Sequence, residues 1–438
     1  MRTIIPPNKT IGSVCGEQTP KGEEKYRYSK YCFSVPCEDG TLLYHATTGE
    51  LVLVSSSDSE EDCRKWLIEH WFLVPEAFEE RKWVDQLRTI IKLLEKKSTS
   101  KTSFTVLTTT DCNARCFYCY EIGIKRNPMT PEMAGKVADY ITDSCGGKSV
   151  KLRWFGGEPL YNRQVIDIIC NRLRDRGIQF ESTMVTNGFY FDRETSRHAC
   201  EHWNLCKVQI TVDGTEKVYN RIKAYIDADE SPYLRVMDNI RFALETGIRV
   251  TVRMNIGEQN AKDLLLLADD LKERFQKYPA FHAYVAVIQD VTGKVHSRYS
   301  MQTQKEDYDR LRDRLAENGI YSRKNILRGL QITRCMADND LCETILPDGR
   351  VGVCEHYSVS MITGSIQDKV HDQEVEKKWK MPLSVPECDQ CVLYPSCTKL
   401  QMCEWYKDGC KELTRSIELD EIKKRMVEVY QEHKAEEQ

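Results

Sequence analysis

The stretch TTTDCNARCFYCYE, residues 108–121, places three cysteines within eight positions: Cys112, Cys116 and Cys119. Three closely spaced thiolates on one loop can hold three irons of a cubane iron–sulfur cluster and leave the fourth iron open to another ligand. The alternative is a zinc site that takes its fourth ligand from elsewhere in the chain. The spacing alone favours the cluster and leaves the zinc site open.

This cysteine loop (residues 108–121) follows the first of six short β-rich runs that alternate with longer helical patterns over 101–330. Such alternation predicts a parallel sheet with crossover helices. We expect strands over 104–109, 150–155, 180–186, 207–212, 249–255 and 282–288, and helices over 131–144, 164–176, 233–246 and 261–277. This α/β pattern fits a partial (β/α)6 TIM barrel, with an open doubly wound sheet as the alternative. Parallel barrels carry their active sites at the carboxyl ends of the strands, where the cysteine loop falls.

The composition limits the class of protein. The 438 residues allow two or three domains. With 63 Lys and Arg against 67 Asp and Glu, the formal net charge of -4 gives no general reason to expect nucleic acid or an anionic membrane as a partner. The N-terminus lacks an apolar signal region and no run reaches about eighteen apolar residues, so we expect a cytoplasmic protein. Nineteen cysteines in a reducing compartment indicate metal binding or catalysis rather than disulfides.

Residues 1–100 are typical of a separate small α+β module. Short strands separated by turns are expected within 28–56, followed by helices over 57–70 and 75–97. The polar run EKKSTSKTS, residues 95–103, is the expected linker to the barrel.

The C-terminal part is marked by cysteines. Eight of the nineteen lie between Cys335 and Cys410, within a loop-rich segment over 331–412 that has little apolar material for a core. Metal sites are expected to organise such a segment. Residues 413–438 predict an amphipathic helix with one buried apolar stripe.

The cysteine loop and the segments after the next strands resemble the radical S-adenosylmethionine (SAM) superfamily. The family signature has three cysteines with this spacing and an aromatic residue before the last, here Tyr118. WFGGEPL at 154–160 resembles the family's Gly-Gly-Glu segment, while TNG at 186–188 and ITVDG at 210–214 follow the third and fourth strands. The resemblance implies a 4Fe–4S cluster on the three cysteines, with SAM on the open iron.

The resemblance also implies which residues bind the methionyl part of SAM. Glu158 would accept from its ammonium group, while Gly156 and Gly157 allow close backbone approach. Arg253 and Asn255 alternate on the fifth strand and point the same way, where they would hold the carboxylate. The alternative for these two is a strand-end ion pair or polar pair.

Four further residues are implied as contacts of the nucleoside part of SAM. Thr211 and Asp213 lie in phase at the end of the fourth strand and would reach the ribose. Asn187 and Tyr118 would line the ribose and adenine region.

The C-terminal cysteines resemble the SPASM (twitch-type) extension of radical SAM enzymes, which houses two auxiliary iron–sulfur clusters. The first would take Cys335, Cys342, Cys354 and Cys403, and the second Cys388, Cys391, Cys397 and Cys410. The sequence departs from the family where five residues, instead of the usual three, separate Cys397 from Cys403. The resemblance implies three 4Fe–4S clusters in all, and a zinc ribbon is the alternative for the C-terminal set.

The N-terminal module carries a second resemblance. DGTLLYHATTGELVLVS, residues 39–55, is similar to winged-helix-like leader-recognition modules of radical SAM maturases for ribosomal peptides. There a precursor's leader adds a strand to an exposed sheet edge. The alternative is a structural lid. CNARCFYCYE at 112–121 likewise resembles peptide maturases, including thioether-forming sactipeptide and ranthipeptide synthases.

We therefore predict a radical SAM peptide maturase. A 5′-deoxyadenosyl radical would abstract a hydrogen from a residue of a ribosomally made precursor peptide. An intramolecular crosslink would follow, with a thioether favoured over a carbon–carbon or carbon–oxygen bond. Glu355, directly after Cys354, resembles the base of sulfatase-maturing enzymes and is the expected catalytic residue, with an ordinary supporting role as the alternative. An external donor of the flavodoxin or ferredoxin type would supply electrons.

Other functions fit the same motifs. Within catalysis, the alternatives are an anaerobic sulfatase-maturing (formylglycine) enzyme, a peptide epimerase and a small-molecule SPASM enzyme. Outside catalysis, the alternative is a zinc-stabilised protein-interaction protein.

Overall fold

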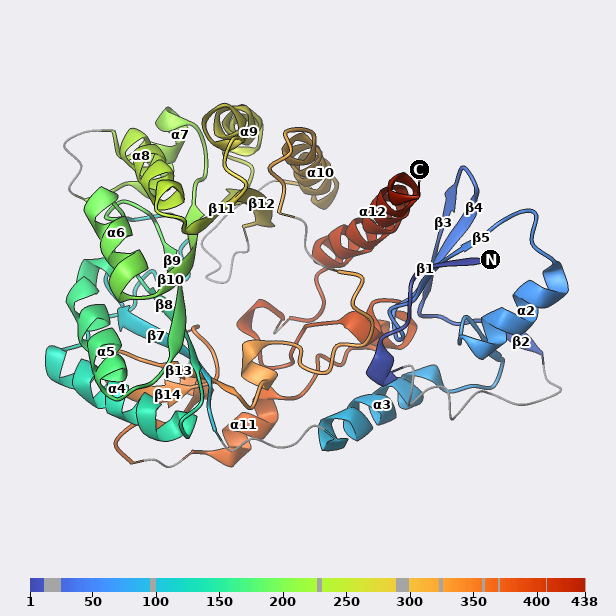
Figure 1. Ribbon diagram of the computed structural model, residues 1–438, viewed down its shortest axis with the longest axis horizontal. Coiled ribbons are helices and arrows are strands. Elements are labelled where there is room, and N and C mark those ends of the chain that lie inside the picture. Colours follow the sequence, from blue (N-terminus) through green and yellow to red (C-terminus); the bar gives the residue numbers. More distant parts are fainter. Residues whose placement is uncertain are drawn as a thin grey trace. The chain divides into compact units, whose positions relative to one another are not determined.

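The structure is a computed structural model of the 438-residue chain. It describes residues 1–11, 25–94, 100–226, 231–288, 299–322, 326–356, 359–368, 371–406 and 408–437. The chain divides into two compact units (Figure 1). Unit 1 comprises Met1–Lys97, Lys324–Cys335 and Met381–Gln438, and unit 2 comprises Ser98–Arg323 and Met336–Lys380.

Unit 2 is built on a parallel sheet whose strands follow one another in chain order, β12-β11-β10-β9-β8-β7. In the described residues these strands are β7 (Ser103–Thr109), β8 (Val150–Gly156), β9 (Phe180–Thr186), β10 (Leu205–Thr211), β11 (Arg249–Ile256) and β12 (Phe281–Val287). Each lies within two residues of its predicted range. The predicted α/β fold with a partial barrel is confirmed.

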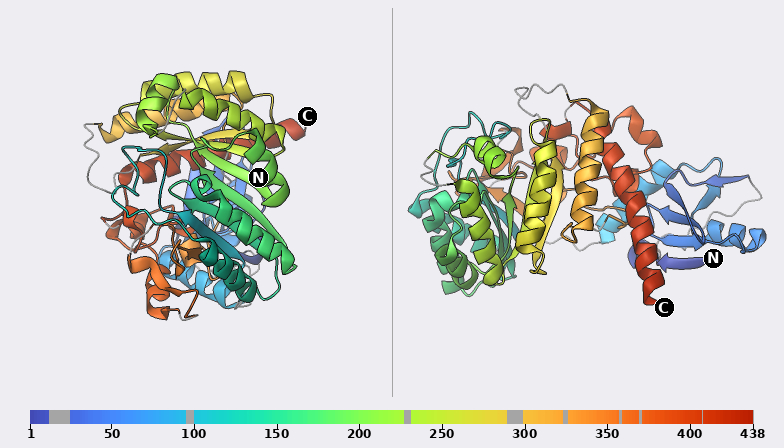
Figure 2. Two further views of the ribbon diagram at one scale, coloured as in Figure 1. Left: turned by 90° about the vertical axis from the view of Figure 1, so that its left-hand side faces the viewer. Right: turned by 90° about the horizontal axis from the view of Figure 1, so that it is seen from above.

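The crossover helices of unit 2 line the outer side of these strands (Figures 1 and 2). They are α4 (Pro131–Cys145), α5 (Arg163–Asp175), α6 (Arg193–His202), α7 (Glu216–Lys223), α8 (Pro232–Glu245), α9 (Ala261–Phe275) and α10 (Met301–Glu317). On β10, Val208 and Ile210 are fully buried. The alternate residues Lys207, Gln209 and Thr211 point to the opposite face because side chains alternate along a strand. The inner face of the barrel is therefore polar along this strand.

A hairpin extends the same sheet beyond β7. β13 (Cys342–Ile345) pairs with β7 in parallel, and β14 (Arg350–Gly352) and β15 (Ile362–Ser365) follow antiparallel. Gly349 turns the chain between β13 and β14 with φ +82°, a conformation that favours glycine. A short helix, α11 (Gln373–Trp379), comes after β15. The hairpin places Cys342 at the start of β13 and Cys354 just after β14.

Unit 1 is centred on an antiparallel sheet of order β1-β5-β4-β3. Its strands are β1 (Arg2–Ile5), β3 (Cys32–Cys37), β4 (Gly40–His45) and β5 (Leu51–Val54), and β2 (Tyr26–Tyr28) pairs separately with β6 (Leu73–Pro75). The helices of unit 1 are α2 (Glu60–Glu69), α3 (Glu80–Leu94) and α12 (Glu412–Glu436). Leu42 and Tyr44 of β4 share a core with Met426 of α12, while Leu43 on the other face packs with Leu67 of α2.

The structure refines two sequence expectations and leaves a third partly outside the described residues. The helix expected over 75–97 begins at Glu80, because Leu73–Pro75 pairs with Tyr26–Tyr28 as a strand. Residues 95–99 of the expected linker lie outside the described residues. The expected segment 331–412 does not form one body, since 336–380 belong to unit 2 and 381–412 join unit 1. In the described ranges, no helix is long and apolar enough to cross a membrane.

The buried side chain of His45 indicates that the folded state of unit 1 loses stability in acid. The imidazole is fully buried, and its Nδ1 accepts from the Thr48 amide at 3.3 Å, which requires the neutral ring. Burial lowers the pKa of His45 to about 3, far below its ordinary value of about 6.5. The His45 imidazole therefore binds a proton in the unfolded chain at a pH where it stays neutral in the folded chain. The free energy of unfolding falls as the pH drops below about 6.5.

We expect the urea unfolding free energy of the wild type to fall more steeply below pH 6 than that of His45→Gln, by about 1.4 kcal/mol per pH unit. His202→Gln, at a half-exposed histidine, is the control and should keep the wild-type slope. Equal slopes for wild type and His45→Gln would contradict the assignment.

Candidate active site at the carboxyl ends of the strands

The cysteine loop lies between β7 and α4, at the carboxyl end of the first barrel strand. Backbone hydrogen bonds hold it in place. The Arg115 amide donates to the Lys223 carbonyl at 2.7 Å, and the Glu158 amide donates to the Asp111 carbonyl at 2.9 Å. The ends of α7 and β8 thus position the loop.

Gly156 and Gly157 pack directly against the cysteine loop. A β-carbon on Gly156 would lie 2.2 Å from the carbonyl oxygen of Thr109, and one on Gly157 would lie 2.3 Å from that of Asp111. Both distances are sterically excluded, and Gly156 also has φ +119°. The absence of a β-carbon at both positions therefore permits a backbone-to-backbone contact within the protein. This contact accounts for the two glycines whether or not they also contact SAM.

Glu158 is fully buried behind this contact. Its carboxylate accepts from the Thr186 hydroxyl at 2.7 Å, the Asn187 amide at 2.8 Å and the Leu160 amide at 3.1 Å. Burial raises the pKa of Glu158 to about 7, and these hydrogen bonds oppose the rise. Glu158 thus joins the ends of β8 and β9, and its contact with the methionyl ammonium stays a prediction.

Asp213 is fully buried, and both its carboxylate oxygens have partners. Oδ2 accepts from the Tyr118 hydroxyl at 2.5 Å and pairs with Lys223 Nζ at 2.7 Å. Oδ1 accepts from Asn255 Nδ2 at 2.9 Å. The structure therefore brings Tyr118, Asp213 and Asn255, three of the residues expected at SAM, into one network around a lysine.

Sequence reasoning missed Lys223, which ends α7. Its side chain is 1% exposed, and Nζ also donates to the Thr211 hydroxyl at 2.7 Å. Burial lowers the pKa of Lys223, but Asp213 and the neighbouring tyrosine and cysteine groups together outweigh this effect, so the pKa lies well above its ordinary value. The local sequence NRIKAY, residues 220–225, is that of an ordinary exposed helix end, so no sequence signal marked it.

Arg253 and Asn255 lie on one face of β11, as their alternation predicts. Arg253 Nε donates to Asn255 Oδ1 at 2.8 Å. Among the described residues Arg253 forms no ion pair with a carboxylate. Its charge is therefore available to a carboxylate ligand, and this role stays a prediction.

Asn187 connects the end of β9 with the cysteine loop. Its Nδ2 donates to Asn113 Oδ1 at 2.7 Å and lies 3.8 Å from the sulfur of Cys112. It is 8% exposed. Asn187 therefore reaches the rim of the cysteine site, where the nucleoside contact was expected.

The three cysteines provide a donor set of soft thiols on one loop. Burial raises the pKa of the Cys112 and Cys119 thiols to about 12, so these sulfurs stay protonated at neutral pH until a metal displaces the proton. Over the described ranges, no group of three or more His, Cys, Asp or Glu side chains is arranged around a single metal ion. In a cubane each thiolate binds a different iron. The donor set fits a 4Fe–4S cluster, which Cys112, Cys116 and Cys119 would hold.

The second auxiliary set lies wholly in unit 1, as Cys388, Cys391, Cys397 and Cys410. Burial raises the pKa of the Cys391 thiol, and the charges of the other three sulfurs raise it further. The four thiols are thus close enough to interact, and as a donor set they fit a four-cysteine cluster.

The first auxiliary set divides between the units. Cys335 and Cys403 belong to unit 1, whereas Cys342 and Cys354 belong to unit 2. This set stays a prediction.

Glu355 follows β14 in unit 2. Its Oε2 lies 3.9 Å from the sulfur of Cys354. The next residue, His356, packs against Tyr120 of the cysteine loop with ring centroids 4.5 Å apart. The hairpin thus brings the segment that carries Glu355 against the cysteine loop, while its catalytic role stays a prediction.

Comparison with known sequences identifies the central domain. The Radical SAM superfamily model matches residues 106–271. A probable GTP 3′,8-cyclase of Methanocaldococcus jannaschii is 26% identical over 252 residues, covering 55% of this chain and 78% of that protein. The Fe-coproporphyrin III synthase of Methanosarcina barkeri is 26% identical over 208 residues, and the match covers 46% of this chain and 49% of that protein.

Comparison with solved structures finds the same fold. Native anSMEcpe with bound AdoMet has a TM-score of 0.58 at 16% identity, covering 75% of this chain and 99% of that one. Streptococcus suis SuiB bound to precursor peptide SuiA has a TM-score of 0.52 at 13% identity, covering 88% of this chain and 95% of that one. The family match falls on the strands that carry the cysteine loop and its polar network. The matched residues, 106–271, are therefore a Radical SAM superfamily domain, which implies SAM and a 4Fe–4S cluster as cofactors.

Proposed function

We propose that this chain is a peptide maturase that crosslinks a ribosomally made precursor, with a cysteine thioether as the favoured product. The observation that carries the proposal is unit 1, a separate sheet-bearing body joined to a radical SAM barrel. The fold match to the peptide-bound SuiB covers 88% of the chain, whereas that to anSMEcpe covers 75%. The wider match supports a precursor as substrate.

The edge strand β3 is the proposed docking site for the leader. In the sheet order β1-β5-β4-β3, the outer edge of β3 pairs with no other strand among the described residues. A leader that adds a strand there gains main-chain hydrogen bonds with little demand on its sequence. Pro36 removes one donor from β3 and so limits the length of such pairing.

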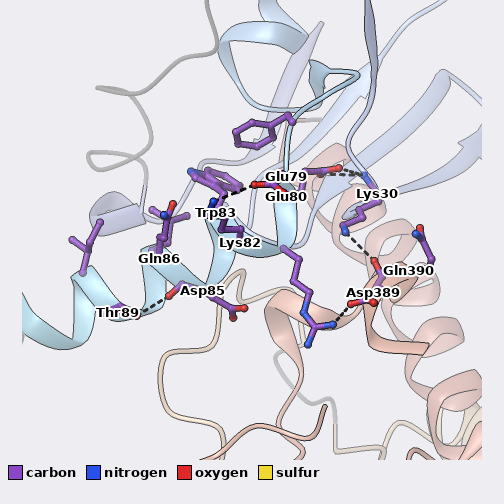
Figure 3. Close-up of a pocket in the computed structure, with 14 residues that line it drawn as sticks. Lys30, Glu79, Glu80, Lys82, Trp83, Asp85, Gln86, Thr89, Asp389 and Gln390 are labelled. Atoms are coloured by element: carbon purple, nitrogen blue, oxygen red, sulfur yellow. Dashed lines mark hydrogen bonds and ion pairs between the residues drawn. The ribbon is translucent and has the colours of Figure 1, made fainter. Parts of the chain in front are cut away.

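A cavity of about 990 Å³ in the same unit supports a peptide at this surface (Figure 3). It runs along α3, from Phe78 to Ile90, and is also lined by Lys30, which precedes β3 by two residues. Apolar side chains near the end of α3 are exposed, with Leu93 at 71% and Leu94 at 67%. A groove along a helix that also exposes apolar side chains suits an amphipathic leader.

The proposed chemistry divides between cofactors and side chains. When bound, the cluster and SAM would supply a 5′-deoxyadenosyl radical, and an auxiliary cluster would serve as the acceptor of one electron. The substrate carbon would lose a hydrogen atom to the radical, and the cysteine thiol would lose a proton. With the loss of one electron, the carbon and the sulfur would then share one new C–S bond. Glu355 would accept that proton. Lys223, Asp213 and Tyr118 would hold the nucleoside side of the site in shape.

We also propose that the chain carries three 4Fe–4S clusters and receives electrons from a flavodoxin-type or ferredoxin-type donor. The support is the count of eight cysteines from Cys335 to Cys410, which equals the requirement of two fully ligated cubanes. A second candidate function is cyclisation of a small molecule, because the sequence relatives include GTP 3′,8-cyclases.

The test uses the anaerobically prepared full chain, SAM, a reductant and any short cysteine-containing peptide that a search finds encoded beside its gene. We expect the peptide to lose two hydrogens, with the new bond located by tandem mass spectrometry. Formation of 5′-deoxyadenosine with an unchanged peptide mass, or turnover of GTP instead, would sink the proposal.

Glu355→Gln tests the base. We expect product formation to fall by about a hundredfold while 5′-deoxyadenosine still forms, because the proton acceptor is lost and radical generation is not. Glu374→Gln, at an exposed carboxylate on α11, is the matched control and should behave as wild type. Equal product yields for the two variants would remove Glu355 from the mechanism.

A further inference from the structure

A cavity of about 480 Å³ lies at the amino-terminal ends of β10, β11 and β12 in unit 2. Its polar lining consists of Lys207, Arg249, Thr251, His282, Tyr321 and Ser322. Two of these residues are cationic, a third is histidine, and the lining contains no acidic residue. The cavity is at the opposite end of the strands from the cysteine loop, and nothing in the SAM site uses it.

The positive charges of this cavity lack acidic partners among the described residues. Lys207 and Arg249 stand directly opposite each other in the β10–β11 register, and like charges so placed repel. Among the described residues, Lys207 and His282 form no hydrogen bond or ion pair, and Arg249 contacts the sulfur of Cys206 at 3.8 Å. By contrast, Lys151 on β8 is paired with Glu181 at 3.6 Å. An anion in the cavity would relieve the repulsion.

The cavity has a formed wall. The Ser322 amide donates to the Ala283 carbonyl, and the Ala283 amide donates to the Ile320 carbonyl, both at 2.7 Å. These bonds hold Tyr321 and Ser322 beside β12 through an isolated parallel bridge between Ala283 and Tyr321. Thr251, at 7% exposure, forms part of the floor. The recess is therefore defined by backbone as well as by surface side chains.

The cavity and the predicted SAM contacts lie on the same face of the sheet. Lys207, Gln209 and Thr211 are alternate residues of β10, as Arg249, Thr251 and Arg253 are of β11. Four residues of strand separate Lys207 from Thr211, or about 13 Å at about 3.3 Å per residue. An extended peptide on this face covers that distance with about four residues.

We propose that the cavity binds a carboxylate of the substrate peptide, about four residues from the residue that loses its hydrogen atom. This inference rests on the proposed peptide substrate and adds a specificity site to it. Paired cations beside an imidazole match a carboxylate through charge-assisted hydrogen bonds. The carboxylate belongs either to an Asp or Glu side chain or to the C-terminus of the peptide.

The first test is the double variant Lys207→Gln/Arg249→Gln, with Lys151→Gln as the control. Lys207 and Arg249 are exposed, so neutral replacements leave the fold intact. With the peptide from the gene neighbourhood, we expect KM to rise about tenfold or more and kcat to change little, because binding is lost and the reacting groups are untouched. The control should keep wild-type values.

The second test changes the peptide. Each Asp and Glu is replaced by Asn or Gln in turn, and the C-terminus is amidated in a separate peptide. One change should raise KM for the wild type and have no further effect in the double variant, and its identity names the source of the carboxylate. A Lys207→Glu variant should in turn prefer the peptide with Lys at that position.

The outcomes separate the two proposals. If the peptide is modified and no acidic group affects KM, the cavity proposal is overturned and the proposed function stands. If no peptide is modified and GTP binds to the wild type more tightly than to the double variant, the cavity is a phosphate site and both proposals fail.

Discussion

Replacing Cys112, Cys116 and Cys119 together by Ala is expected to abolish 5′-deoxyadenosine formation. The three sulfurs are the predicted ligands of the cluster that would cleave SAM, and without them that cluster would have no protein ligands. Iron and sulfide analysis should show a loss of about four irons per chain, the content of one cubane. Product analysis after incubation with SAM and reductant gives the activity.

Cys200→Ala is the matched control, because Cys200 is exposed on α6 and belongs to none of the three ligand sets. It should keep both iron content and activity. If the triple variant kept its full iron content, the assignment of this cluster would be wrong. Zinc in place of iron in the wild-type protein would support the zinc alternative.

Lys223→Met is expected to lower the free energy of unfolding by about 3–5 kcal/mol and to weaken SAM binding. The change leaves the Asp213 carboxylate buried beside Tyr118 without its cation, and an uncompensated buried charge is costly. The variant also removes the contacts that hold the polar network in place at the carboxyl end of β10. Urea unfolding and the KM for SAM measure the two effects.

Two variants make this prediction sharp. Lys377→Met removes an exposed lysine that pairs with Glu374 and should leave stability unchanged. The double variant Lys223→Met/Asp213→Leu should recover part of the lost stability, because it removes the unpaired charge, and should not recover SAM binding. Wild-type stability in the single variant would show that the pair carries little energy.

Much of the barrel was predictable from the sequence because its signals are local. The run over 180–186 became β9 with the same bounds, since period-two patterns of β-formers need no distant information. Arg253 and Asn255 were placed on one face by alternation alone, and the structure joins them by a hydrogen bond. The cysteine spacing likewise required no fold, because the three predicted ligands lie on one loop.

Other features depended on segments far apart in the chain. The helix expected from residue 75 begins at Glu80, because Leu73–Pro75 pairs as a strand with Tyr26–Tyr28. The expected C-terminal body divided for a similar reason. Residues 342–345 add to the barrel sheet beside β7, while Met426 of the last helix enters the core of the N-terminal module.

The sequence by itself predicted the resemblance to the radical SAM superfamily, the positions of the barrel strands and the three cysteines expected to hold the cluster, because each is written in a short contiguous pattern. Tertiary structure alone decided the partners of the charges. In the sequence, Lys223 resembles a surface lysine. In the structure, the end of α7 lies at the end of β10, where Lys223 pairs with Asp213. In the sequence, nothing marks Lys207 and Arg249. In the structure, the strand register places them opposite each other in a cavity whose lining contains no acidic residue. Burial and pairing depend on which segments meet in space, and that is decided only when the chain has closed its long loops.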